Sequence, residues 1–180
     1  MAQPATIYNV EIDLADHDRG VFESLAIRAA RHPSESEEYF ATRLLAYALE
    51  YADGIEFSRG GISDPDDPPI VVRDLTGALK LWIEIGNPDA ARLHKASKAS
   101  PRVAVYTHKD PAQLMARLAG EKIHKAEDVE IWAVDRALVG QLAATLDRRM
   151  SFTMSVTDRE ITISLNDATL TGALVRRPLT

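Results

Sequence analysis

Two carboxylates in the middle of the chain have a spacing that suits a metal site. Asp74 follows the short apolar run 70–72, and Glu84 lies near the end of a second apolar run, 78–85. Both runs are typical of buried strands. A Glu at the end of a buried strand, with an Asp on the preceding strand, costs free energy unless a partner compensates its charge. A divalent metal ion would be such a partner.

The strand predicted at 78–85 places its residues on two opposite sides. Alternate residues of a strand share a face. The residues expected beside Glu84 are Lys80, Trp82 and Gly86.

Two strand carboxylates, a further carboxylate on a helix and a nearby base suit the metal-assisted hydrolysis of a phosphodiester. The metal would polarise a phosphoryl oxygen and generate hydroxide, and a lysine would stabilise charge on the phosphate. The spacing alone is a weak signal, because Asp and Glu are common at strand ends and are usually solvated there.

Each of these residues also has a purely structural explanation. Asp74 would stabilise the turn that follows it, and Glu84 would form an ion pair with Lys95 or Arg92. Trp82 fits a packed core better than a platform on which a base stacks.

Basic residues are concentrated in one stretch, which a solvated helix face explains best and a phosphate-contacting patch explains second best. These residues are Arg92, His94, Lys95, Lys98 and Arg102.

The composition is that of an ordinary globular protein, with 46% apolar and 27% charged residues among 180. Cysteine is absent, which excludes disulfides and thiolate metal sites and fits a reducing compartment. We expect a cytoplasmic protein without a signal peptide or membrane span. The net charge of −6 means that any nucleic-acid binding must be local.

The first part of the chain predicts a hairpin and a helix. Residues 5–14 alternate between apolar and polar types, residues 16–20 form a turn cluster, and 21–30 continue as a second strand. A helix is predicted from Ser34 as N-cap, with Glu37 at the capping-box position, to about residue 53. The polar loop 60–69 is too rich in proline for a regular element, and its aspartates do not complete a calcium loop.

Strands and helices alternate after residue 70. Helices are expected at 88–100, 111–120 and 135–146, and strands at 103–106 and 129–134, before an antiparallel tail at 151–175. This pattern predicts one compact α/β domain over residues 1–180, with a mixed sheet flanked by helices and antiparallel hairpins at both chain ends.

Several short motifs are spread along nearly the whole chain. They are residues 30–35 (ARHPSE), 43–46 (RLLA), 51–53 (YAD), 57–60 (FSRG) and 82–86 (WIEIG), with Pro88, Arg92 and 95–96 (KA). Together these motifs resemble those of the YaeQ family.

The resemblance implies a compact α/β fold built around a variation of the PD-(D/E)XK nuclease core, which is restriction-endonuclease-like. That superfamily places one acid on the first helix, an Asp before a turn, and a Glu two residues before a lysine on the next strand. By this pattern Asp74 and Glu84 are the strand carboxylates, and Glu38 or Glu35 is the helical one. These three carboxylates would hold magnesium or manganese.

The sequence departs from the nuclease pattern at two positions. Arg73, rather than proline, precedes Asp74, and Gly86 stands where the lysine should follow Glu84. We expect Lys95, on the following helix, to take over the role of that lysine.

We expect Arg92 and Lys98 to contact phosphate beside Lys95. The predicted function is therefore a divalent-metal-dependent nuclease or phosphodiesterase. The alternative is a non-catalytic module that binds nucleic acid or protein and retains the nuclease fold.

Overall fold

A computed structural model describes residues 4–58 and 67–179. The chain divides into two compact units, the first made of Met1–Tyr51 with Val134–Leu174 and the second of Ala52–Ala133 with Val175–Thr180. Most of the loop predicted at 60–69 lies outside the described residues. Within the described part of the chain, no helix is both long and apolar enough to cross a membrane.

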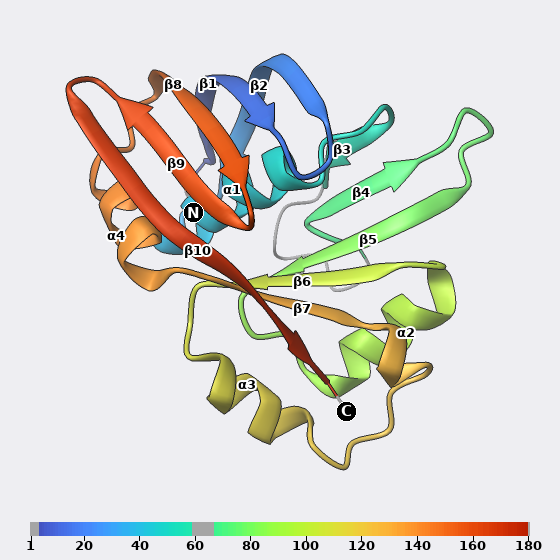
Figure 1. The fold of residues 1–180 in the computed structure, drawn as a ribbon. Helices are drawn as coiled ribbons and strands as arrows, with labels where there is room; N and C mark the ends of the chain where they lie inside the picture. Colours follow the sequence, from blue (N-terminus) through green and yellow to red (C-terminus); the bar gives the residue numbers. More distant parts are fainter. Residues whose placement is uncertain (1–3, 59–66, 180) are drawn as a thin grey trace. The chain divides into compact units, whose positions relative to one another are not determined.

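The first unit opens with the predicted hairpin. Strand β1 (Thr6–Asp16) pairs antiparallel with β2 (Val21–Arg31), from Thr6 opposite Arg31 to Asp16 opposite Val21. Alternate residues of β1 are buried or exposed, as the sequence pattern predicts. Figure 1 shows this hairpin in blue.

The C-terminal strands extend the same sheet. They are β8 (Arg149–Thr157), β9 (Glu160–Leu165) and β10 (Ala168–Pro178), which pair antiparallel in chain order. Because β8 also pairs with β1, in parallel, the two predicted hairpins share one sheet with the order β2-β1-β8-β9-β10.

Two helices supply the core of the first unit. They are α1 (Glu37–Leu49) and α4 (Arg136–Ala144), and their fully buried side chains include Phe40, Leu44 and Leu138. Helix α1 begins later than predicted, because the hydroxyl of Ser36, not that of Ser34, accepts the capping hydrogen bond from the Tyr39 amide. It also ends at Leu49, before the predicted residue 53.

The second unit contains a five-stranded mixed sheet. Its strands are β3 (Ile55–Phe57), β4 (Ile70–Arg73), β5 (Leu79–Ile85), β6 (Val103–Thr107) and β7 (Glu130–Val134), in the order β7-β6-β5-β4-β3. Strands β3, β4 and β5 pair antiparallel, whereas β5, β6 and β7 pair parallel.

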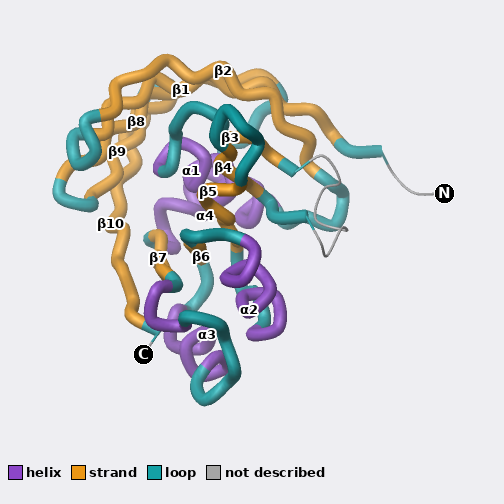
Figure 2. Tube along the Cα trace, turned by 90° about the vertical axis from the view of Figure 1, so that its right-hand side faces the viewer, coloured by secondary structure: helices purple, strands orange, loops and turns teal. Residues whose placement is uncertain are grey.

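Helices α2 (Ala90–Ala99) and α3 (Pro111–Leu118), both drawn in purple in Figure 2, pack on the second unit's sheet. Trp82 of β5, Leu93 of α2 and Leu114 of α3 lie in one buried cluster, so Trp82 is a core residue. Helix α2 starts at Ala90, after the capping residue Asp89, two residues later than the predicted start at 88. A short 3₁₀ helix, Ala126–Asp128, precedes β7.

The predicted α/β class, with mixed strands and flanking helices, is confirmed. The described residues contain four α-helices and both parallel and antiparallel strand pairs. The nuclease core and the single-domain organisation stay predictions.

Candidate functional site

Asp74 belongs to the turn between β4 and β5, which are adjacent and antiparallel. Its Oδ1 accepts hydrogen bonds from the Thr76 amide (2.9 Å), the Thr76 hydroxyl (2.6 Å) and the Ala78 amide (3.0 Å). The turn is completed by Gly77, whose φ of 85° is strained for other residues. Asp74 therefore has the structural role that the sequence left open.

The electrostatics of Asp74 agree with this role. The hydrogen bond from the Thr76 hydroxyl is the main cause that lowers the pKa of Asp74, and Lys80 Nζ contributes from 3.6 Å. Both partners are local and solvent-accessible.

Glu84 lies at the other end of the same hairpin. In the register of β4 and β5, Ile70 is opposite Ile83, whereas the Asp74 amide bonds to the Ala78 carbonyl. Glu84 is thus level with residue 69, about 17 Å along the strand from Asp74 at roughly 3.3 Å per residue. The register separates the two carboxylates that the sequence analysis expected to converge.

The side chain of Glu84 is buried, and one of its carboxylate oxygens accepts two hydrogen bonds. Its Oε1 accepts from the indole of Trp82 (2.7 Å) and from Nε of Arg92 (2.6 Å). Burial raises the pKa of Glu84, and its effect is larger than the opposing effect of Arg92. The purely structural explanation of Glu84 predicted an ion pair with Lys95 or Arg92, and Arg92 forms one.

Arg92 joins Glu84 to the start of β4. Its Nη2 donates to the backbone carbonyl of Asp67 (3.0 Å), and its own amide is capped by Asp89 (2.8 Å). The Asp67 carboxylate in turn accepts from the hydroxyl of Ser58 (2.5 Å). We call Glu84, Arg92 and Asp67 the Glu84 site.

Asp67, which the sequence pattern did not single out, contacts Arg92 of the Glu84 site through its backbone carbonyl. It precedes β4, so it lies at the Glu84 end of the hairpin, while Asp74 follows β4 at the turn end. Counting back from the turn at Gly77 would have indicated this, because an antiparallel register pairs the residues that are equally far from the turn.

Gly86 has a backbone conformation that favours glycine. Its φ is 84°, and its amide donates to the Tyr106 carbonyl at 2.9 Å. Side chains other than that of glycine are strained at such a φ.

Lys95 and Lys98, which were predicted to act at the site, lie on α2 with exposed side chains. The described hydrogen bonds to Glu84 come from Trp82 and Arg92. The approach of Lys95 to Glu84 therefore stays a prediction. Lys98 lines a separate hollow at the C-terminal end of α2.

The two candidate helical acids belong to the first unit. Glu35 is buried beside Arg43, with 3.1 Å between Oε2 and Nη2, and accepts from the His32 amide. Burial raises the pKa of Glu35 more than Arg43 lowers it. Glu38 is exposed on α1. Glu35 is thus a structural ion-pair residue, and Glu38 stays a prediction.

The Glu84 site contains two carboxylates, those of Glu84 and Asp67, and carboxylate oxygens are the ligand type that a hard divalent cation prefers. Within the described part of the chain, Oε1 of Glu84 accepts the hydrogen bonds from Trp82 and Arg92. Magnesium is commonly held by one or two carboxylates and several waters. Among the described residues, no three His, Asp or Glu side chains gather in one metal-binding group.

Comparisons with known proteins give one consistent result. A family model described as "YaeQ protein" matches residues 1–174. The proteins named "Uncharacterized protein YaeQ" of Escherichia coli (strain K12) and Shigella flexneri are each 35% identical over 166 residues, 91% of both chains.

Two solved structures are also similar. The YaeQ protein from Pseudomonas syringae superposes with a TM-score of 0.86 at 32% identity and covers 97% of each chain. That from Xanthomonas axonopodis pv. citri gives a TM-score of 0.82 at 31% identity, with 97% of this chain and 98% of the other covered.

Proposed function

The chain belongs to the YaeQ family, and we propose that it is a divalent-metal-dependent phosphodiesterase acting on nucleic acid, with its centre at Glu84. The observation that carries the proposal is a buried carboxylate at the end of β5 that is held by an arginine from α2. An apolar residue would fill this place in the core at lower cost, because the desolvation of a buried charge costs roughly several kcal/mol unless a partner compensates it.

The residues of the Glu84 site have distinct proposed roles. Glu84 Oε2 and the carboxylate of Asp67 would hold magnesium or manganese, which when bound supplies a polarised phosphoryl oxygen and a hydroxide. Arg92 keeps the Glu84 carboxylate in place and contacts the phosphate with the part of its guanidinium that is exposed. Trp82 donates a second hydrogen bond to Oε1 from its indole N–H and so helps to hold the carboxylate in place.

The alternative function is a non-catalytic module that binds nucleic acid. Two observations favour it: Glu84 already has a cationic partner, and Gly86 leaves the strand without the superfamily's lysine. Such a module would bind without turnover, and its affinity would fall as salt displaces it from the phosphates.

A cleavage assay separates these functions. Single- and double-stranded DNA and RNA are incubated with magnesium or manganese and with the wild type, Glu84→Gln, Asp67→Asn or Asp74→Asn. If the protein is an enzyme, it should cleave at least one of these substrates, and Glu84→Gln and Asp67→Asn should each abolish the cleavage. Asp74→Asn is the matched control, because Asp74 lies at the far end of the same hairpin and should keep full activity.

The outcomes exclude each other. Salt-sensitive binding without cleavage supports the module, and loss of cleavage in Asp74→Asn alone would move the centre to the turn. Neither binding nor cleavage on any of these substrates would show that nucleic acid is the wrong ligand class.

A further inference from the structure

A polar hollow of about 300 Å³ lies in the second unit at the C-terminal end of α2. Helix α2 contributes Ser97 and Lys98, and the segment before β7 contributes His124, Lys125 and Asp128. None of these residues belongs to the Glu84 site. Its volume is at the lower end of the range for small-ligand sites.

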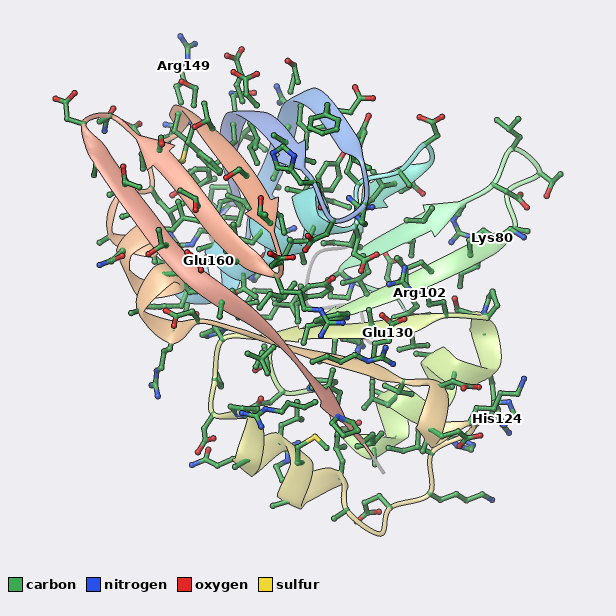
Figure 3. The ribbon with its side chains drawn as sticks, in the orientation of Figure 1. Lys80, Arg102, His124, Glu130, Arg149 and Glu160 are labelled. Atoms are coloured by element: carbon green, nitrogen blue, oxygen red, sulfur yellow. The ribbon has the colours of Figure 1, made fainter. Side chains whose placement is uncertain are left out.

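The hollow is bordered by positive charge from two separate parts of the sequence. The His124 amide donates to Nδ1 of His94 at 3.0 Å, which joins α2 to the segment before β7. Desolvation lowers the pKa of His94, and the charges of Lys98, Lys122 and His124 lower it further. Figure 3 labels His124 beside this helix.

These lysines differ from other cations of the molecule. Arg102 forms a bidentate pair with Glu130, whose side chain it faces in Figure 3, and Arg92 pairs with Glu84. Within the described ranges, Lys98, Lys122 and Lys125 form no ion pair. The positive charges of these three lysines are therefore available to attract an anion.

Ser97 supplies an independent indication of a ligand. Ser97 lines the hollow, and its Oγ is buried without a hydrogen-bond partner among the residues that the structure describes. Buried hydroxyls nearly always have a partner, because an unmade hydrogen bond costs free energy. An oxygen of a bound anion would satisfy it.

We propose that this hollow binds the phosphate group of a nucleotide, either free or within a nucleic-acid chain. Lys98 and Lys125 provide charge to the phosphate, and Ser97 donates a hydrogen bond to it. Asp128 is also in the lining and would repel a bare anion, so its carboxylate accepts a hydrogen bond from a ligand hydroxyl instead. A phosphate beside a hydroxyl is the chemistry of a nucleotide. This site does not depend on the proposed catalysis at Glu84.

An NMR titration of the full chain tests the site. Adenosine monophosphate is added at low salt, and amide shifts are followed at residues 97–101 and 124–129. Lys98→Gln and Lys125→Asn should each weaken binding about tenfold, the usual effect of one charged hydrogen bond. Asparagine is chosen at 125 because it tolerates the φ of 48° there. Lys109→Gln, an exposed lysine outside the hollow, is the control.

Three further measurements complete the test. Ser97→Ala should weaken binding without changing its salt dependence, and Glu84→Gln should leave it unchanged. Loss of binding in Glu84→Gln, or equal affinity in Lys98→Gln and the wild type, would overturn the proposal. A short oligonucleotide that binds more tightly than the mononucleotide, with the same sensitivity to Lys98→Gln, identifies a nucleic-acid chain as the source of the phosphate; equal affinities identify a free nucleotide.

Discussion

Arg92 Nε lies 2.6 Å from Oε1 of Glu84, and this ion pair joins helix α2 to the end of strand β5. The two side chains differ in burial: 4% of Glu84 is exposed, against 23% of Arg92. Removing the arginine therefore leaves a buried carboxylate without its charge partner, whereas removing both charges leaves two neutral groups.

The first prediction concerns this pair. Arg92→Gln should lower the free energy of unfolding by about 2–3 kcal/mol in urea denaturation, and the double variant with Glu84→Gln should recover most of it. Arg102→Gln is the control, because Arg102 pairs with Glu130 from a more exposed position and should cost only about 0–1 kcal/mol. Equal losses at the two sites would contradict the special role of the Glu84 pair.

The second prediction concerns pH. Burial raises the pKa of Glu84 above its ordinary value of 4.5, so the folded state disfavours the ionised form. The stability of the wild type relative to Glu84→Gln should therefore be highest below pH 4.5 and fall as pH rises from there through the raised pKa. Denaturation midpoints of both proteins from pH 4 upward check this, and a difference that grows with pH would show that the sign is wrong.

The third prediction concerns the hydrophobic side of the hairpin. Leu81 is 4% exposed, whereas Leu75 at the turn is fully exposed. Leu81→Ala should lower the free energy of unfolding by about 2–5 kcal/mol, because it removes packed methyl groups. Leu75→Ala should change it by no more than about 0.5 kcal/mol. Comparable effects of the two substitutions would contradict the burial of Leu81 in the core.

The fourth prediction concerns Gly86. Its positive φ means that Gly86→Ala should cost about 1–2 kcal/mol of folding free energy. A Cβ added at Gly140 in helix α4 would meet open space, so Gly140→Ala should instead stabilise by roughly 0.5–1 kcal/mol. Thermal melts of both variants test the contrast, and a Gly86→Ala protein as stable as the wild type would mean that a side chain is tolerated at this position.

Much of the architecture follows from local sequence pattern. The alternation in residues 5–14 and 151–175 gives the strands of both hairpins, since side-chain burial in a strand has a period of two. The parallel pairing of β1 with β8 could not be predicted in this way. Those strands are more than a hundred residues apart, and nothing local specifies which strand edges meet.

The candidate site was predictable only in part. The pattern around Glu84 indicated a buried strand carboxylate and named Arg92 among its partners. Asp74 was assigned by its place before a turn, where a catalytic and a turn-stabilising Asp have the same sequence signature. The distinction lies in the register, which places Asp67 rather than Asp74 at the Glu84 end.

The central claim is that Glu84 and Asp67 together hold a divalent cation. Calorimetric titration with manganese and magnesium tests it most directly, and binding should also raise the thermal midpoint of the wild type by mass action. The account predicts that Glu84→Gln and Asp67→Asn each lose the response while remaining folded, and that Asp74→Asn retains it. A wild type that binds neither metal, or a response that disappears in Asp74→Asn and persists in Glu84→Gln, would contradict the account.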